Sequence, residues 1–512
     1  MDIELIAESM ADRDVRRVFG IPGSGTSLSL IDAMEKRGVE FCLTHFEGSG
    51  VIMAATAGRL SGRAGWSLSI KGPGLANAIP GLAVAWFESM PVVHLAEAAA
   101  PDSPASEAHK RIDHGRLVGG VAKRLRRLTP GICGIVEWAL EAEREVPGPV
   151  VVDLIENAEE PPAIDVAREI SADDCSIGDR LSISERPIVI AGSLGIRQHW
   201  GSNLSELRIP VFSTAAAKGI VDEHSSHAAG VFTGAGGELS PEAQLLPEAD
   251  LVIGLGVTAR EVLATKPFAC PAISVEAVET PGIEGFAFTD RVGIDKANTV
   301  FNVLGEKAWG DDLVGESIAR LRDNLLEGFL PGRVFEVVET YFARRVRAVF
   351  DVGYFCTVGE HMWRASRPDW ALLSGQGRYM GTSVPMAIGA SLYDPSVPTI
   401  AFVGDGGIGM YLAELKLAVK HRLPLLVVLM TDNAFGSIRS RAITNGLSQT
   451  PLIMDGRSWT GIIEAMGLPS SRAEGDADLR DALDAWDPES GPGFIEVAFD
   501  PDAYEAMVQG IR

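Results

Sequence analysis

The sequence has no long apolar run, few cysteines and a deficit of positive charge. No uninterrupted apolar stretch approaches the roughly 18 residues that a membrane-spanning helix requires. The amino terminus, MDIELIAESMADRD, is acidic where a signal peptide would be basic. Both absences predict a soluble, cytoplasmic protein that does not act on a membrane.

Cysteine usage and charge exclude further classes. The five cysteines lie far apart, and no C-x-x-C pair indicates a zinc site or a redox dithiol. The formal net charge of −24 would repel nucleic acids and anionic membranes, so neither is an expected partner. The single basic cluster, KRLRRL at 123–128, is interpreted as a solvated face.

What the sequence does contain is a repeated alternation of strand and helix patterns. A length of 512 residues predicts about three domains. Apolar, β-branched runs alternate with helix-period segments, which is typical of α/β domains with doubly wound parallel sheets. Expected strands are GWSLSI, PVVHLA, GPVVVDL, RPIVIAG, DLVIGLG, TIAFVGD and PLLVVLMTD. Breaks at 156–176 and, less clearly, at 326–339 predict domains at 1–160, 180–330 and 340–512.

One glycine-rich segment carries the strongest chemical signal. In IAFVGDGGIGMYLAEL, residues 400–415, Gly404, Gly406 and Gly409 form a G-x-G-x-x-G pattern between an expected strand and helix. The outline is that of a dinucleotide fingerprint, whose glycines let the backbone approach a pyrophosphate. Asp405 inside the turn would repel that group unless a cation lay between them. The segment therefore predicts a metal bridging Asp405 and a diphosphate, with two capping carboxylates as the alternative.

A hard cation such as Mg²⁺ needs further oxygen ligands, which a neighbouring strand end would supply. The strand in LPLLVVLMTDNAFGSIR delivers Asp432 and Asn433, and Asp432 follows Asp405 by 27 residues. A Rossmann fold expects its ribose-binding acid roughly 20 residues on, and it leaves Asp405 unexplained. A flavin or nicotinamide oxidoreductase is thus the weaker hypothesis.

The order GDGG, helix, LP, strand and TDNAFG resembles the cofactor-binding motif of thiamine diphosphate-dependent enzymes. It is similar in particular to the superfamily of acetolactate synthase, benzoylformate decarboxylase and pyruvate decarboxylase. The resemblance implies that Asp405, Asp432 and the main-chain oxygen of Ala434 bind Mg²⁺, with Asn433 as the runner-up to Asp432. It also implies that the cofactor is bound by Gly404, Asp405, Gly406, Gly407, Phe435 and Gly436.

The resemblance covers nearly the whole chain, and it implies pyrimidine-binding, central and diphosphate-binding domains. Glu47, which precedes a helix of small residues, occupies the place of the family's catalytic glutamate. That glutamate bonds the aminopyrimidine and promotes formation of the C2 ylid; taken alone, Glu47 would be a charge favoured by the helix dipole. Further residues implied to bind the cofactor are Gly72, Gly74 and Asn77 from IKGPGLAN, and Gln376 and Met380 from SGQGRYMG.

Two departures from the family pattern bear on the substrate and on flavin. GVFTGAGG at 230–237 differs from the phrase of the flavin-carrying synthases, so FAD is not expected. The paired histidines of pyruvate decarboxylases are missing, and EAHKRIDH at 107–114 stands where synthases have Phe-Gln-Glu-Ile-Asp. Candidates for binding an anionic group of the substrate, a carboxylate, phosphonate or sulfonate, are Ser24, Lys71, His109 and Lys110.

The resemblance implies a 2-oxo acid decarboxylase or carboligase of the acetolactate synthase type, whose enamine intermediate is protonated or captured by a second carbonyl. A non-decarboxylating C–C lyase or hydrolase on a diketone is one alternative. A catalytically decayed thiamine fold is another, although retention of Glu47, Asp405 and Asp432 argues against it. The family's site lies between two chains, so the resemblance implies a homodimer at minimum and commonly a homotetramer.

Overall fold

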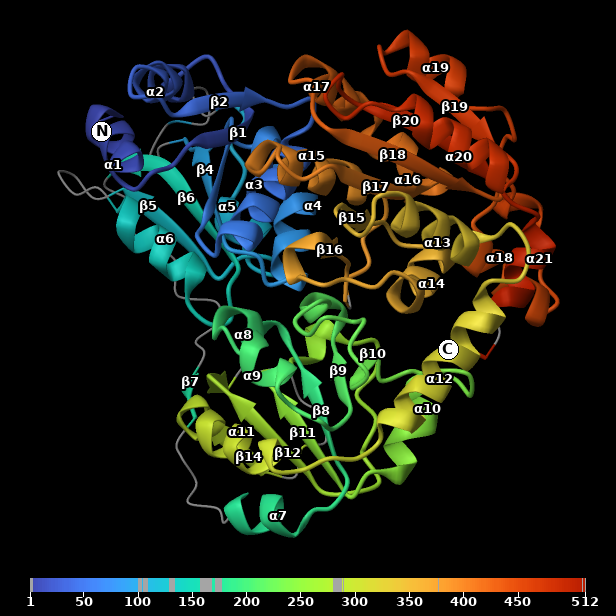
Figure 1. The fold of residues 1–512 in the computed structure, drawn as a ribbon. Coiled ribbons are helices and arrows are strands. Elements are labelled where there is room, and N and C mark those ends of the chain that lie inside the picture. Colours follow the sequence, from blue (N-terminus) through green and yellow to red (C-terminus); the bar gives the residue numbers. More distant parts are fainter. Residues whose placement is uncertain are drawn as a thin grey trace. The chain divides into compact units, whose positions relative to one another are not determined.

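Three six-stranded sheets, each with all its strands parallel, make up the computed structural model (Figure 1). The structure describes residues 3–99, 104, 109–128, 134–156, 168–170, 177–279, 288, 290–375, 377–508 and 510–511. Helices separate the strands along the chain, which confirms the predicted α/β class with three parallel sheets. Within the described residues, no helix is long and apolar enough to cross a membrane.

The first compact unit comprises the described parts of 1–167 together with 385–394 and 413–417. Its sheet has the order β2-β1-β3-β4-β6-β5. The strands are β1 (Arg17–Ile21), β2 (Glu40–Leu43), β3 (Gly65–Ser69), β4 (Val92–Glu97), β5 (Arg124–Leu128) and β6 (Pro149–Glu156). The helices of its amino-terminal part are α1 (Ile3–Asp12), α2 (Thr26–Glu35), α3 (Glu47–Ser61), α4 (Pro73–Phe87), α5 (His114–Val118) and α6 (Ile135–Glu143).

The basic run at 123–128 is not the solvated face that its charge suggested. Five of its six residues form the whole of the edge strand β5, in which Leu125 and Leu128 are buried. Arg126 donates from Nε to Glu141 of α6 at 2.8 Å. The strand alternation of R-L-R-R-L therefore outweighs its charge, because its arginines have carboxylates to pair with.

A histidine lies at the centre of this sheet. His94 of β4 is fully buried, with its Nδ1 2.9 Å from Ser67 Oγ and its Nε2 2.9 Å from Ser69 Oγ. Burial, reinforced by the nearby His114, lowers the pKa of His94 from 6.5 to about 3. The sheet thus holds an imidazole that stays neutral in mild acid.

We expect this unit to lose stability in mild acid because of His94. Below pH 6.5 the unfolded chain binds a proton at this residue, while the folded chain does not until about pH 3. The contribution of His94 to the free energy of unfolding should fall as the pH is lowered, with a slope approaching about 1.4 kcal/mol per pH unit. Urea unfolding at several pH values between 7 and 5 would measure it. His94→Gln should flatten the dependence, and an equally steep loss in that variant would contradict the assignment.

The second compact unit comprises the described parts of 168–384, 395–412 and 418–512, and it contains two six-stranded sheets and one two-stranded sheet. The central sheet has the order β10-β9-β8-β11-β12-β14. Its strands are β8 (Pro187–Ala191), β9 (Val211–Ser213), β10 (Ala228–Val231), β11 (Leu251–Leu255), β12 (Ala272–Glu276) and β14 (Asp290–Gly293), and β7 (Arg168–Glu169) pairs antiparallel with β13 (Val278–Glu279). Helices of this part are α7 (Ile177–Ile183), α8 (Ser193–Arg197), α9 (Gly201–Ser205), α10 (Pro241–Leu245), α11 (Ala297–Gly305) and α12 (Asp311–Leu325).

The carboxyl-terminal sheet has the order β16-β15-β17-β18-β20-β19. Its strands are β15 (Arg347–Phe350), β16 (Ala371–Leu372), β17 (Thr399–Gly404), β18 (Leu425–Thr431), β19 (Ser470–Ala473) and β20 (Gly493–Ala498). The helices along this stretch of chain are α13 (Pro331–Tyr341), α14 (Tyr354–Met362), α15 (Ser383–Tyr393), α16 (Asp405–Tyr411), α17 (Leu415–Lys420), α18 (Gly436–Thr444), α19 (Thr460–Ala465), α20 (Asp476–Ala485) and α21 (Pro501–Met507). Phe335, Phe350 and Phe402 pack together in its core, with ring centroids 4.9 to 5.4 Å apart.

The seven predicted strands correspond to β3, β4, β6, β8, β11, β17 and β18, and they are confirmed. All are central strands or their direct neighbours, whose two buried faces give continuous apolar runs. The predicted linker at 156–176 lies largely outside the described residues. Most of the second predicted break, 326–339, belongs to helix α13, which starts at Pro331.

Candidate active site

The glycine segment joins β17 to α16 without an intervening turn. β17 ends at Gly404, and α16 begins at Asp405, so the expected turn at 405–409 is instead the first part of a helix. A Cβ at Gly407 would lie 2.1 Å from Asp351 Oδ2, so only glycine allows this close approach. Nothing similar constrains Gly409, where a Cβ would have only an ordinary contact with Trp459. The match of Gly409 to the dinucleotide pattern is therefore incidental.

Asp405 is held in a fixed orientation at the carboxyl ends of β17 and β18. Its Oδ1 accepts from Gly406 N–H at 2.8 Å, and its Oδ2 accepts from the Thr431 hydroxyl and Asn433 N–H, each at 2.8 Å. Asn433, whose N–H makes one of these bonds, has a positive φ of 56°. Burial raises the pKa of Asp405 above its ordinary value, against the effect of these donors.

Asp432 faces the same region. Burial, followed by the charge of Asp405, raises the pKa of Asp432 from 3.8 to about 6. Two partly buried carboxylates that repel each other provide a setting that a cation would stabilise. The Asn433 side chain lies near Gly456 and 3.5 Å from the Thr431 hydroxyl, which itself donates to Asp405. The ligand set of Asp405, Asp432 and the main-chain oxygen of Ala434, with Asn433 as the runner-up to Asp432, stays a prediction.

Two of the predicted apolar cofactor contacts meet beside Gly406. A Cβ at Gly406 would lie 2.8 Å from Phe435 Cε1 and 3.3 Å from Met380 Sδ. A Cβ at Gly436 would lie 2.7 Å from Asp432 Oδ2, so this predicted position also adjoins the acidic pair. Gln376 lies outside the described residues.

Asp351 is a site residue that the sequence did not reveal. It follows β15 directly, is 1% exposed, and accepts from Gly381 N–H at 2.9 Å. Burial raises its pKa from 3.8 to about 7. Asp351 thereby connects the turn that carries Met380 to Gly407 of α16, and positions both beside Asp405.

In the first unit, Glu47 begins α3 at the carboxyl end of β2. It is 7% exposed and accepts from Asn77 Nδ2 at 3.1 Å. A Cβ at Gly74 would lie 3.4 Å from Glu47 Oε1. The structure therefore brings together Glu47, Gly74 and Asn77, which the resemblance assigned to one end of the cofactor.

A second carboxylate, missed by the sequence reasoning, fixes the start of α3. Glu414 is 1% exposed and accepts from the backbone N–H groups of His45 and Phe46, each at 3.0 Å. These donors belong to the helix start, where backbone N–H groups lack partners within the helix. Glu414 therefore positions Glu47, which comes directly after Phe46.

Gly72 is fixed from the other side by α5 and the residues before it. It has φ of +62°, and a Cβ there would lie 1.9 Å from the carbonyl oxygen of Lys110. Its N–H donates to His114 Nε2 at 3.2 Å, while His114 Nδ1 lies 2.6 Å from Asp153 Oδ1. His114 therefore donates from Nδ1 to Asp153, and this pair holds the glycine loop in place. The sequence offered no signal for it beyond the histidine itself.

The candidate substrate residues separate into two groups. Lys71 and Lys110 line one cavity of about 300 Å³, which His109 does not line. Ser24 is exposed on the turn before α2. On that turn the Glu97 carboxylate already accepts from Ser27, from its N–H at 2.8 Å and from its hydroxyl at 2.6 Å. The charge of Glu97 would repel a substrate carboxylate, which disfavours Ser24.

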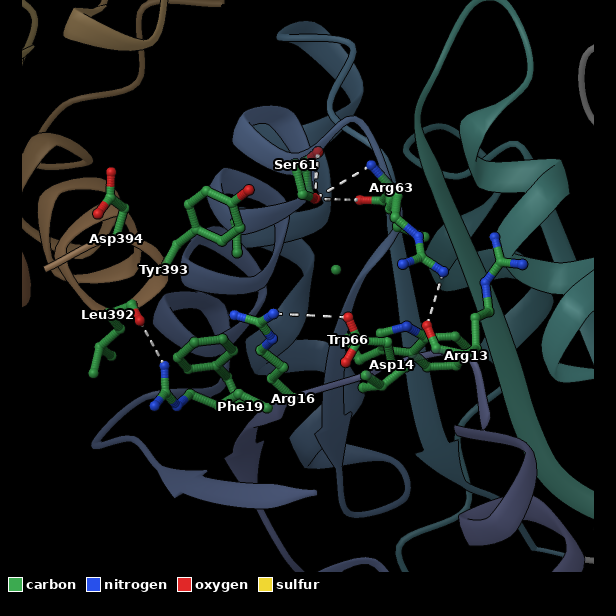
Figure 2. Close-up of a pocket in the computed structure, with 16 residues that line it drawn as sticks. Arg13, Asp14, Arg16, Phe19, Ser61, Arg63, Trp66, Leu392, Tyr393 and Asp394 are labelled. Atoms are coloured by element: carbon green, nitrogen blue, oxygen red, sulfur yellow. Dashed lines mark hydrogen bonds and ion pairs between the residues drawn. The ribbon is translucent and has the colours of Figure 1, made fainter. Parts of the chain in front are cut away.

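Figure 2 shows another cavity of the first unit, of about 460 Å³, where β1 and β3 begin. Its arginines are engaged within the protein. Arg13 pairs with Glu143 at 2.8 Å, Arg63 donates to the carbonyl of Arg13 at 2.8 Å, and Arg17 donates to the carbonyl of Leu392 at 2.8 Å. Parallel sheets place ligands at the carboxyl ends of their strands, so this cavity is not the candidate active site.

Comparison with known proteins assigns the chain to a family. Residues 3–115, 176–278 and 351–497 match models described as the N-terminal TPP binding, central and C-terminal TPP binding domains of thiamine pyrophosphate enzymes. The chain belongs to the thiamine diphosphate-dependent enzyme superfamily. Glu47 and the Gly72 loop fall within the first match, and Asp405 and Asp432 fall within the last. The family resemblance read from the sequence is confirmed.

Relatives within this family are acetolactate synthases. The chain is 24% identical to the catabolic acetolactate synthase of Raoultella terrigena, over 97% of this chain and 94% of the relative. It is 23% identical to the acetolactate synthase of Bacillus subtilis strain 168, over 97% of this chain and 93% of the relative. It is 25% identical to the acetolactate synthase large subunit of Lactococcus lactis, over 85% of this chain and 81% of the relative. These likenesses identify a thiamine diphosphate-dependent enzyme with synthase relatives.

The described residues fit thiamine diphosphate and a magnesium ion. Among them, no three His, Cys, Asp or Glu side chains gather as a metal site. Two carboxylates with backbone oxygens and a diphosphate would instead form the oxygen-rich, incomplete protein cage that Mg²⁺ prefers. The cofactor itself is supported by the family matches, whereas the magnesium ion stays a prediction.

Proposed function

We propose that this chain is a thiamine diphosphate-dependent 2-oxo acid decarboxylase or carboligase of the acetolactate synthase type. The observation that carries the proposal is Glu47, which is buried at the start of α3 and paired with Asn77. Thiamine diphosphate supplies a nucleophilic carbon that adds to the carbonyl and accepts the electron pair left by departing CO₂. The protein has to supply a proton acceptor, a metal site and a shaped pocket.

The residues of the chain divide these tasks. Glu47 exchanges a proton with the pyrimidine end of the cofactor, and its burial with one amide partner keeps competing water away. Asp405 and Asp432 would hold the cation that neutralises the diphosphate. Met380 and Phe435 flank Gly406 and shape the apolar wall between the two ends.

FAD is not part of the proposal, because the central sheet carries its own anion at the expected phosphate position. Glu261 accepts from Ser193 N–H at 2.9 Å and from the Ser193 hydroxyl at 2.8 Å. It also accepts from Thr214 Oγ1 at 2.6 Å. Ser193 begins α8 directly after β8 and Gly192, where a dinucleotide would place its phosphates. The Glu261 carboxylate would repel them.

We further propose that two chains complete the site. The family's arrangement joins the amino-terminal domain of one chain to the carboxyl-terminal domain of another, so a homodimer is the minimum and a homotetramer is expected. A small-molecule carbonyl compound is the expected partner in the reaction.

The test is a panel of 2-oxo acids incubated with the purified protein, thiamine diphosphate and Mg²⁺. We expect CO₂ release from at least one acid, and an acyloin when a second carbonyl compound is present. Release of CO₂ with only an aldehyde product would identify simple decarboxylation. Cleavage of a diketone without any CO₂ from the panel would contradict the proposal and support the lyase or hydrolase alternative. Inactivity toward both classes would support a decayed fold.

A further inference from the structure

A cationic cavity lies beside the glycine loop of the first unit. It has a volume of about 300 Å³, large enough for a small organic acid, and it lies where β3, β4, β5 and β6 end. The residues that line it include Lys71, Lys110, Arg111, Arg127, Asp113 and Asp153. Lys71 directly precedes Gly72, so the cavity adjoins the loop assigned to the cofactor.

The charges in this cavity do not cancel. Among the residues that the structure describes, four cationic side chains line it, against the two carboxylates Asp113 and Asp153. Asp153 already accepts from His114 at 2.6 Å, and it lies 3.6 Å from Arg127 Nε. Asp113 caps α5, where it accepts from Arg116 N–H at 3.1 Å. Both carboxylates are thus engaged, and the cavity is positive in a chain whose net charge is −24.

The two lysines are the cations left for a ligand. In the part of the chain that the structure describes, neither Lys71 nor Lys110 has a hydrogen-bond or ion-pair partner. Lys71 is half-buried, so it is not an ordinary solvated lysine. Lys110 has a φ of +62°, a left-handed conformation that a residue with a side chain seldom adopts. Strained residues that the surrounding structure enforces gather at ligand sites.

The surrounding contacts show what enforces the conformation of Lys110. Its carbonyl oxygen packs on Gly72, at a position that a Cβ would fill. Gly72 is itself bound by His114, whose imidazole is fixed by Asp153. The backbone at Lys110 is therefore built into the same assembly as the glycine loop, and Lys110, an exposed residue, lines the cavity beside that loop.

We infer that this cavity binds a second, terminal anionic group of the 2-oxo acid donor, with Lys71 and Lys110 as its specificity-determining residues. The inference rests on the proposed function and narrows its substrate class to dianionic 2-oxo acids. A carboxylate, a phosphonate and a sulfonate share the required chemistry, since each offers several acceptor oxygens to ammonium groups. An uncharged alkyl terminus would leave the two ammonium groups without a counter-charge.

Matched pairs of substrates test the inference. 2-Oxoglutarate and 2-oxopentanoate differ only in a terminal carboxylate, and 3-phosphonopyruvate and 2-oxobutanoate form a shorter pair for a phosphonate. We expect the wild-type enzyme to prefer the dianion of at least one pair in kcat/KM. Lys110→Gln and Lys71→Gln should each lower that preference about 10- to 100-fold, as expected for a lost hydrogen bond to a charged group. Lys36→Gln is the control, because Lys36 is exposed on the same unit, pairs with Asp32, and lies outside the cavity.

A binding measurement separates failure of the inference from failure of the proposed reaction. Calorimetry with the unreactive acids glutarate and 3-phosphonopropionate, against pentanoate, needs no turnover. Suppose that no 2-oxo acid reacts, but that a dianion binds to the wild-type protein, binds more weakly to Lys110→Gln, and binds to Lys36→Gln with the wild-type affinity. In that case the proposed reaction is wrong and the anion site stands. If turnover occurs without preference for either dianion, or Lys110→Gln and Lys71→Gln leave the preference unchanged, the inference is overturned. Absence of both turnover and dianion binding would also overturn it.

Discussion

Replacing Glu47 by glutamine is expected to lower kcat by about two to four orders of magnitude, the usual contribution of a positioned acid or base. Glutamine keeps the size of the side chain, and its oxygen can still accept from Asn77 Nδ2, as Glu47 does at 3.1 Å. What is lost is the capacity of the carboxyl group to accept and return a proton. Steady-state kinetics with the active 2-oxo acid would measure the fall, and proton–deuterium exchange at the reactive carbon of the bound cofactor should slow in parallel.

The control for this variant is the integrity of the cofactor site. Glu47→Gln should bind thiamine diphosphate with Mg²⁺ within a few fold of the wild-type affinity, since neither metal ligand is altered. Asn77→Ala removes the partner of Glu47 but keeps its carboxyl group, so a smaller decrease in kcat is expected. Turnover of Glu47→Gln close to the wild-type value would exclude Glu47 as the proton acceptor. If Glu47→Gln does not fold, the buried carboxyl group is needed for stability. Glu47→Asp is then the variant to measure, and the catalytic role requires that it folds without full activity.

The parts of the site that sequence reasoning could reach are those made by contiguous segments. Gly404 to Gly407 and Asp432 to Gly436 each lie within one strand–helix connection, and paired parallel strands bring the two connections together. Buried parallel strands also have the plainest apolar patterns, which is why three sheets could be predicted.

The missed residues act across long sequence separations and leave no local pattern. Glu414 holds the start of α3 from 369 residues away, counted to His45. Asp351 reaches Gly381 at a separation of 30 residues, and Asp153 reaches His114 at 39. Such carboxylates look in the sequence like any other acid, because only the fold supplies their burial and their partners.

Local propensity was also misleading at Asp405. Consecutive glycines are poor helix formers, costing about 1 kcal/mol each relative to alanine, and they suggested a turn. The segment nevertheless forms a helix because tertiary packing stabilises it. Gly407 lies against Asp351, and Gly406 lies against Met380 and Phe435. The same glycines that weaken the helix allow these close approaches, so the tertiary contacts override the propensity.

Asp405→Ala is expected to abolish Mg²⁺-dependent binding of thiamine diphosphate. The change removes one proposed side-chain ligand and leaves Asp432 to face the diphosphate alone. Loss of a residue that only orients a metal ligand by a hydrogen bond typically weakens metal binding about 10- to 100-fold, so loss of a direct ligand should weaken it further. Calorimetry with thiamine diphosphate at saturating and at zero Mg²⁺ would measure the effect. The melting temperature of the cofactor-free variant would show whether the unpaired Thr431 hydroxyl and Asn433 N–H disturb folding.

Two further variants test whether Asp432 or Asn433 is the second metal ligand. Asp432→Asn removes the charge at the proposed second ligand and should weaken Mg²⁺ binding strongly. Asn433→Gly removes the rival side chain while tolerating the φ of +56° and keeping the N–H that donates to Asp405 at 2.8 Å, so its affinity should stay near that of the wild type. The opposite ranking would transfer the ligand role to Asn433. Unchanged affinity in Asp405→Ala would refute the metal site altogether, because Asp405 is the proposed ligand that Gly406, Thr431 and Asn433 hold in place between β17 and β18.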